Sequence, residues 1–458
     1  MAKKYQIDLL NGNIFKSLII YALPLIGTNV LQLLFNSVDV FVLGFMVGDE
    51  AVAAVGSVGA LINLVIGLFT GLAVGANVAV ALCVGRGDQE KSERIVGMSV
   101  IISVVAGVII AAIGVAFSRT FLEWMSCDAA VIDLAAKYLR IYFIGMPIMM
   151  LYNFVAAILR AVGDTFRPFL FLIVAGVINL GLNVFFIAVV GMDVDGVAIA
   201  TVVSQGVSAA LGIIALVKQK GFGHLSAKKI RIYKAELIEV LKVGIPAGLQ
   251  GCIFSITNVM IQSYVNSFGK DAMAGGAIAS QFEGIIFQAM DGVSLSCLAF
   301  TGQNNGAGKF DRIKKVVRVG ALVIVGIGAV VGAILFGVAE LLYPKLTKSA
   351  EVAVIARNRL VIMLSTYFLC GLMGELSNVI RGLGKSVTAM AVTFFGSCVI
   401  RIAWLQIAVP IWDEIETVYL SYPISWIITT LMHLVIYEVL IRKIIKHSET
   451  KPTNPLTE

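Results

Sequence analysis

Long stretches of apolar residues, separated by short polar segments, dominate the pattern of this sequence. Twelve stretches are long enough to cross a bilayer as helices, since about 20 apolar residues span its hydrocarbon core. The pattern predicts helices at approximately 14–44, 52–82, 94–118, 131–158, 167–191, 195–217, 237–267, 272–300, 313–340, 352–378, 386–409 and 418–442. The sequence therefore predicts an all-α polytopic membrane protein with twelve transmembrane helices.

The composition agrees with a membrane protein. Of the 458 residues, 59% are hydrophobic and 14% are charged, whereas about a quarter of the residues in soluble globular domains are charged. The N-terminus shows no short apolar core followed by a small-residue cleavage site, so we expect no signal peptide. The six cysteines have no CxxC spacing and the three histidines have no metal-ligand spacing, so we expect neither disulfides nor a metal site.

Basic residues alternate between successive connecting segments. The N-terminus, the segments after the second, fourth, sixth, eighth and tenth helices, and the tail hold most of the lysines and arginines. The opposite set is poorer in cations and contains acids such as Asp49, Asp193 and Glu414. This asymmetry predicts that both termini are cytoplasmic in a multi-pass protein of the cell inner (plasma) membrane. The net charge of +7 is thus a topology signal, and we expect no nucleic-acid partner.

An internal repeat divides the chain. Ile158-Leu-Arg-Ala-Val-Gly163 returns as Val379-Ile-Arg-Gly-Leu-Gly384, and Ala22-Leu-Pro-Leu25 returns as Gly244-Ile-Pro-Ala247, in nearly the same register. Six helices in each copy give both copies the same orientation, so the sequence predicts two parallel-repeat six-helix bundles. We expect an N-terminal lobe (1–217), a basic cytoplasmic linker (218–236), a C-terminal lobe (237–445) and a cytoplasmic tail (446–458).

A single carboxylate, Asp39, lies near the far end of the first predicted helix. A charge at membrane depth is costly unless it faces a cavity, takes up a proton or finds a partner. Gln32 and Asn36 lie seven and three residues earlier, on the same helix face. We interpret this face as a proton or cation site lining a cavity. The alternative is a carboxylate that is hydrated near the interface or held in a structural pair.

Other polar side chains occur within the apolar stretches. Asn179 and Asn183 share one face of the fifth helix, and Thr201 lies on the sixth helix, so these groups could receive Asp39; they could equally serve only to join helices. In the second half, a Glu–Arg pair involving residues such as Glu375 and Arg401 is the structural alternative to a cation-attracting cleft. The substrate-cleft candidates are Gln32, Asn36, Asn153, Gln205, Glu283, Gln288, Asp291 and Glu375.

Motifs for nucleotide-driven or enzymatic chemistry do not emerge. Gly384-Lys-Ser386 has Val379 where a P-loop requires glycine, so the energy for transport must come from an ion gradient. No nucleophile–base pairing or metal cluster indicates an enzyme. Gly67, Gly71 and Gly75 have the spacing of a close helix contact, which we interpret as packing.

Five short segments, spread over nearly the whole chain, carry a resemblance to a known family. They are Pro24 with Val38-Asp39 and Gly44; Arg160-x-x-Gly163-Asp-Thr-x-x-Pro168 leading to Asn179 and Asn183; Gly196-x-Ala-x-Ala-Thr201; Gly302-Gln-Asn-x-Gly306-Ala-Gly308; and Arg381-Gly-x-Gly384-Lys-Ser386. Together they resemble the multidrug and toxic compound extrusion (MATE) family. The chain has Phe254 or Ser255 where some branches carry an acid in helix 7, which favours the bacterial DinF-like branch.

The resemblance implies a V-shaped pair of six-helix bundles that exports organic cations in exchange for H⁺ or Na⁺. It also implies an ion-coupling site in the N-terminal lobe and a bend of the first helix at Pro24. Carried over by resemblance, the coupling residues are Asp39, Asn179, Asn183 and Thr201. Some members have an acid where Asn183 stands, so the choice between H⁺ and Na⁺ stays open.

The leading hypothesis is therefore a cation-coupled multidrug efflux antiporter that works by alternating access. We expect a monomer in the lipid bilayer that moves small organic cations and needs no cofactor besides its coupling ion. A lipid-linked oligosaccharide flippase of the same superfamily is the alternative, but its cleft should carry several cations, and we expect the spans to be poor in buried cations apart from Arg401. A non-transporting scaffold or receptor is a third possibility, which would need neither duplicated halves nor interior carboxylates.

Overall fold

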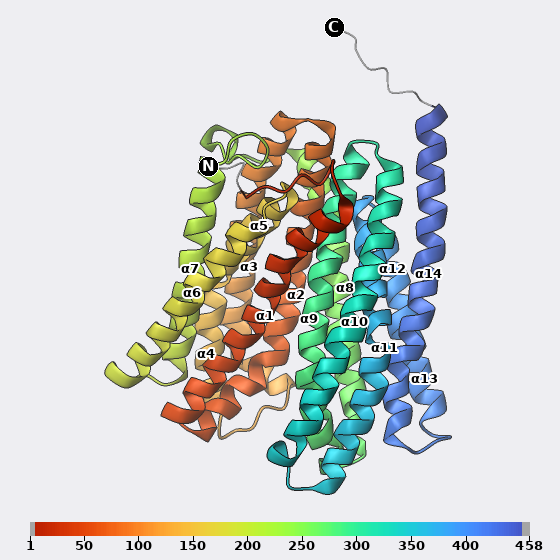
Figure 1. Ribbon diagram of the computed structural model, residues 1–458. Coiled ribbons are helices and arrows are strands. Elements are labelled where there is room, and N and C mark those ends of the chain that lie inside the picture. The colour runs from red at the N-terminus through yellow and green to blue at the C-terminus, as the bar shows by residue number, and fades with distance from the viewer. Residues whose placement is uncertain (1–4, 451–458) are drawn as a thin grey trace. The chain divides into compact units, whose positions relative to one another are not determined.

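The computed structural model describes residues 5–450, which form helices joined by short loops and contain no strand (Figure 1). The predicted all-α class is confirmed, while residues 451–458 of the predicted tail lie outside the described range. The α-helices are α1 (Ile14–Met46), α2 (Asp49–Arg86), α3 (Gln89–Trp124), α4 (Ile132–Ile144), α5 (Met146–Ala161), α6 (Phe166–Val184), α7 (Val194–Lys218), α8 (Lys234–Ser267), α9 (Lys270–Gly306), α10 (Phe310–Leu346), α11 (Ala350–Gly382), α12 (Ser386–Thr393), α13 (Ile400–Ala408) and α14 (Ile415–Thr450). The π-helical turns are η2 (Phe185–Val189) and η4 (Phe394–Val399), and the 3₁₀ turn is η3 (Ala227–Lys229).

The helices are long and apolar enough to account for the predicted spans. Among the described residues, eleven spans pass on length and composition, counting α6 with η2 and α12 with η4 and α13 as single spans. Helices α4 and α5 meet at 50° and together make a twelfth. The break falls at Gly145, and Pro147 stands in the first turn of α5, where a missing N–H costs no helical hydrogen bond.

The described residues form two compact units whose boundaries cut across two helices. Unit 1 contains residues 5–7 and 27–251, and unit 2 contains residues 8–26 and 252–450. The start of α1 therefore belongs to unit 2 and the start of α8 to unit 1, although sequence order alone grouped each with its own half. Pro24 and Pro246, which occupy equivalent positions of the repeat, lie inside these two helices shortly before the change of unit.

Glycines explain why the start of α8 packs into unit 1. A Cβ on Gly71 of α2 would lie 2.0 Å from the backbone N of Gly248, and a Cβ on Gly75 would lie 2.2 Å from the carbonyl O of Val240. Two helix backbones can approach this closely only where neither carries a side chain at the crossing. The glycine spacing of α2 is therefore a packing device.

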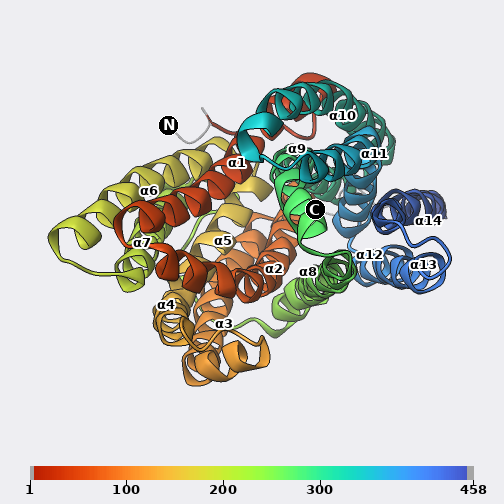
Figure 2. The same ribbon diagram turned by 90° about the horizontal axis from the view of Figure 1, so that it is seen from below.

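The N-terminal segment and the start of α1 pack on unit 2. The ring edge of Tyr21 meets Phe300 of α9, with 5.7 Å between ring centroids. Before the helix, the carbonyl O of the buried Leu9 accepts hydrogen bonds from Asn304 Nδ2 (3.1 Å) and Arg312 Nε (3.2 Å). These contacts attach the chain before α1 to the end of α9 and the start of α10. Helices α9, α10 and α11 lie side by side in this unit (Figure 2).

Candidate functional site

Three helices of unit 1 position the predicted coupling residues. Asp39 lies in the last third of α1, and α6 and α7 lie side by side (Figures 1 and 2). After Asn183 the backbone of α6 widens into the π turn η2, a feature that often marks functional positions in helices. The chain then turns at Gly191, whose φ of +77° suits glycine, and returns as α7. This hairpin brings Thr201 opposite the amides of α6.

The four side chains form a closed hydrogen-bonded network around the carboxylate. Asn183 Nδ2 donates to Asp39 Oδ1 at 2.6 Å, and Thr201 Oγ1 lies 3.3 Å from Asp39 Oδ2. Asn179 Nδ2 donates to Thr201 Oγ1 at 3.3 Å, and Asn183 Nδ2 lies 3.3 Å from Asn179 Oδ1. The structure thus brings together all four residues that the sequence analysis grouped as a coupling site.

The carboxylate of Asp39 is buried without a cationic partner. Asp39 is 7% exposed and Asn183 is fully buried, and within residues 5–450 no lysine, arginine or histidine forms an ion pair with Asp39. Asn183 Oδ1 is buried and accepts no hydrogen bond from the described residues. A buried anion surrounded by oxygens and neutral donors gains stability from a proton or a small cation, which neutralises its charge.

Two tyrosines of α4 belong to the surroundings of Asp39, and the sequence analysis missed them. Tyr138 and Tyr142 are buried and lie near enough to Asp39 to interact with it electrostatically. Their rings stack with 6.1 Å between centroids. The i, i+4 spacing of two tyrosines within an apolar stretch was the available signal, because it puts both rings on one helix face.

The first-half cleft candidates lie outside this network. Gln32 and Asn36 are exposed on α1, whereas Asp39 of the same helix is buried. Asn153 is half-buried and donates to the carbonyl O of Met149 in its own helix at 2.9 Å. Gln205 is half-buried on α7. The side chains of Gln32 and Asn36 therefore do not join Asp39 in one polar network, although the sequence predicts all three on the same face of α1.

A buried Glu–Arg pair occurs in the second half, but it joins residues other than Glu375 and Arg401, which the sequence analysis named for the structural alternative. Glu283 of α9 forms a two-pronged ion pair with Arg359 of α11, at 2.7 and 3.0 Å, and both side chains are buried. Arg401 instead donates to Ser425 Oγ, and its guanidinium lies over the ring of Tyr422. The carboxylate of Glu283 is therefore paired with a cation inside unit 2.

The other second-half candidates have different surroundings. Glu375 is wholly buried, and Cys297 Sγ lies 3.6 Å from its Oε1. Asp291 lies with Tyr367 at a cavity of about 30 Å³ inside unit 2, which is room for one or two water molecules. Gln288 is half-buried on the same helix, α9. Asp291 therefore borders a small cavity of unit 2.

Helices long and apolar enough to span a membrane surround a buried, hydrogen-bonded carboxylate. The protein is therefore an integral membrane protein with a polar site in its interior. Two segments, residues 24–185 and 246–405, match the MatE family, and together they cover more than half of the chain. The chain therefore belongs to the MATE family of transporters, and it is a transporter and not an enzyme. The two matched segments begin at Pro24 and Pro246, which occupy equivalent positions of the internal repeat.

Similar proteins come from several bacteria. The chain is 27% identical to the probable multidrug resistance protein YoeA of Bacillus subtilis (strain 168), over 92% of each chain. It is also 27% identical to the probable multidrug resistance protein NorM of Thermotoga maritima, over 83% of this chain and 82% of that protein. A solved structure of a multidrug resistance MATE family transporter in its outward-facing conformation aligns with 96% of this chain and 99% of its own length, at 22% identity and a TM-score of 0.90. This last likeness supports the fold.

Proposed function

We propose that this protein is a cation-coupled multidrug efflux antiporter of the plasma membrane, with both termini in the cytoplasm. It exports small organic, mostly cationic compounds by alternating access and takes up H⁺ or Na⁺ in exchange, as a monomer and without a further cofactor. Membership in the MATE family and similarity to proteins named for multidrug resistance support export of drugs. The buried Asp39 network, which lacks a cationic partner, is the observation that supports ion coupling.

The chemistry of the Asp39 network provides a route from ion binding to a change in the helices. While Asp39 is ionised, it needs the donors of Asn183 and Thr201, because a buried carboxylate without hydrogen bonds is very unfavourable. A bound proton or cation removes that need and frees these donors for other acceptors. Ion binding therefore alters the contacts among α1, α6 and α7. If the bound ion weakens the binding of the drug, thermodynamic linkage requires that the bound drug weakens the binding of the ion to the same extent. Exchange of the two across the membrane requires this reciprocal effect.

Transport into liposomes tests the proposal. Wild type, Asp39→Asn and the control Asp49→Asn are reconstituted, a H⁺ or a Na⁺ gradient is imposed, and the movement of ethidium is followed. Asp49 is an exposed acid in the first turn of α2, so its variant removes a carboxylate without touching the network. We expect wild type and Asp49→Asn to move ethidium under one gradient only, which names the coupling ion. We expect Asp39→Asn to move none.

Other results would contradict the proposal in distinguishable ways. If Asp39→Asn moves ethidium as fast as wild type, coupling must be sought at another interior acid, first at Asp291, which borders a cavity of unit 2. If wild type moves no organic cation under either gradient, multidrug export is wrong, and flipping of lipid-linked oligosaccharides becomes the function to test.

A further inference from the structure

The segment between α7 and α8 carries exposed cations and exposed isoleucines in close succession. Lys228, Arg231 and Lys234 are exposed, and between them lie Ile230 and Ile232, the latter 67% exposed. We name residues 228–234 the linker strip. Two large aliphatic side chains exposed outside the helical spans are unfavourable in water, so their position calls for an apolar partner.

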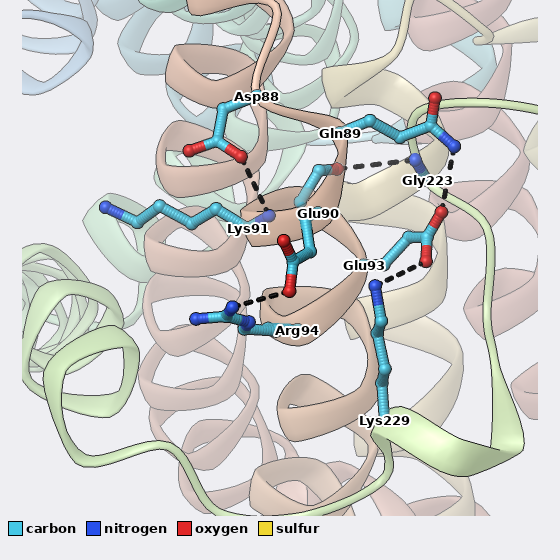
Figure 3. Close-up of polar contacts among 9 residues, drawn as sticks. Asp88, Gln89, Glu90, Lys91, Glu93, Arg94, Gly223 and Lys229 are labelled. Carbon is cyan, nitrogen blue, oxygen red and sulfur yellow. Dashed lines mark hydrogen bonds and ion pairs between the residues drawn. The ribbon is translucent and has the colours of Figure 1, made fainter.

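The backbone of the linker strip is held firmly against α3 (Figure 3). Lys229 Nζ forms an ion pair with Glu93 Oε2 at 2.9 Å. The carbonyl O of Lys229 lies against Gly97, where a Cβ would come within 2.3 Å of it. A little earlier, the N–H of Gly223 donates to Ser92 Oγ at 3.4 Å. The strip therefore presents its outward side chains from a fixed position.

The cations beneath the strip have their own acidic partners. Lys91 pairs with Glu239 at 2.7 Å. Arg94 pairs with Glu90 at 2.6 Å and lies 3.6 Å from Glu236. The carboxylates of Glu90, Glu236 and Glu239, which lie next to the strip, therefore already have cationic partners within unit 1.

The outward cations of the strip are different. Lys228 and Lys234 form no ion pair with any residue of the described range, and the guanidinium of Arg231 lies over the ring of Tyr233 at 4.9 Å without an acidic partner. Their charges are therefore available to anions that come from outside the chain.

The strip runs directly into α8, one of the spans, where exposed isoleucines alternate with exposed lysines. Lys234 is the first residue of that helix, and Ile238, Lys242 and Ile245 follow at helical spacing, all exposed. This face is opposite to the glycine face that packs on α2. Isoleucines and lysines that alternate at the end of a spanning helix match the chemistry of the headgroup region, where aliphatic groups meet the acyl chains and cations meet the phosphates.

We propose that the linker strip binds anionic phospholipids of the adjoining leaflet. Ile230 and Ile232 enter the boundary between headgroups and acyl chains, and Lys228, Arg231 and Lys234 contact the phosphates. A soluble acidic partner would account for the cations but not for exposed isoleucines that continue into a span. The lipid contact fixes the linker between the two halves of the chain, independently of which ion or drug is transported.

Lipid retention tests the electrostatic part. Full-length protein is equilibrated in mixed micelles of phosphatidylglycerol and phosphatidylcholine, purified, and its bound lipids are measured by mass spectrometry. We expect the retained ratio of anionic to zwitterionic lipid to fall about fivefold for each cation removed in Arg231→Gln/Lys234→Gln. The control Lys345→Gln/Lys348→Gln removes two exposed lysines without ion-pair partners in the described range, one in the last turn of α10 and one between α10 and α11. An equal ratio in the two double variants, or full displacement of the lipid by inorganic phosphate, would overturn the proposal.

Fluorescence tests the insertion of the isoleucines. The variant Ile232→Trp is reconstituted with and without brominated phospholipids, and its emission is compared with that of wild type. We expect the additional emission to be quenched by brominated lipid and protected from aqueous iodide. If iodide quenches it and brominated lipid does not, Ile232 faces water, and a soluble acidic partner replaces lipid as the occupant of the strip.

Discussion

The glycine contact between α2 and α8 yields a prediction whose size follows from the coordinates. A Cβ placed on Gly71 would lie 2.0 Å from the backbone N of Gly248 and 2.6 Å from the carbonyl carbon of Ala247. Ordinary contact begins at 3.4 Å, so Gly71→Ala requires the helix crossing to open until the shorter distance grows from 2.0 Å to that value. No side-chain rotation relieves the clash because the neighbours are backbone atoms.

The cost of this separation exceeds what alanine gives back. Overpacking a well-packed contact costs about 1–3 kcal/mol, and here a whole helix crossing must open. Alanine favours a helix over glycine by about 1 kcal/mol, which offsets part of that cost. Gly67→Ala in the same helix is the matched control, because its Cβ meets nothing closer than Gly251 at 3.7 Å. It therefore gains the helix preference without the clash.

Thermal unfolding of the full-length protein in one detergent, at one scan rate, compares the two variants. A fixed scan rate is needed because membrane proteins commonly unfold irreversibly. We expect Gly71→Ala to melt several degrees below wild type, and Gly67→Ala to melt at or slightly above it. If both variants melt at the wild-type temperature, the backbones of α2 and α8 are farther apart than the structure has them, and the glycine spacing is not a packing device.

Three further predictions concern single contacts. Glu283→Gln leaves the buried guanidinium of Arg359 without its anion, so we expect the protein to lose about 3–5 kcal/mol of stability. Adding Arg359→Met should restore most of that loss. Equal melting temperatures of the single and the double variant would contradict this prediction. Gly163→Ala should lower the melting temperature, because Gly163 has φ +92° and a Cβ there would lie 2.4 Å from a backbone oxygen of the N-terminal segment. Gly181→Ala should leave the melting temperature unlowered, because a Cβ on Gly181 meets open space. Partial burial raises the pKa of Asp8, but hydrogen bonds from the residues that follow it outweigh burial and hold the pKa below its ordinary value of 3.8. The stabilisation by Asp8 is thus present at neutral pH and is lost as the pH falls through that lowered pKa. At neutral pH, proteolysis of the N-terminal segment should therefore be faster in Asp8→Asn than in wild type. In strong acid the two proteins should be cleaved at the same rate.

Much of the fold followed from hydrophobic pattern alone, because a bilayer requires long apolar helices with few alternatives. The bend between α4 and α5 lay within a single predicted span, since Gly145 and Pro147 act on geometry and not on hydropathy. The assignment of the starts of α1 and α8 to opposite units was not predictable from chain order. It depends on backbone contacts such as that of Gly71 with Gly248, whose partners belong to different halves of the internal repeat.

At the site, too, the spacing of residues along one helix predicts some contacts and leaves others unpredicted. The i, i+4 spacing of Asn179 and Asn183 predicts a shared helix face that could receive Asp39, and the resemblance supplied their role as coupling residues. Spacing could not identify the partner of Glu283, because the periodicity of one helix says nothing about which other helix lies beside it. Arg359 stands near the start of α11, and only the packing of α9 on α11 brings it to Glu283.

The two halves of the repeat surround their interior carboxylates differently. Asp39 is held by the amide of Asn183 and the hydroxyl of Thr201, which are neutral groups. In unit 2 the carboxylate of Glu283 already has a guanidinium, which makes the pair neutral without an ion. The repeat counterpart of Asp39 is Ile261 or its neighbour, and Ile261 is buried in an apolar cluster. Unit 2 also contains Glu375, which is wholly buried beside the neutral thiol of Cys297. Duplication therefore accounts for a shared scaffold, while the hydrogen-bonded network of Asp39, Asn183, Asn179 and Thr201 occurs in the first copy.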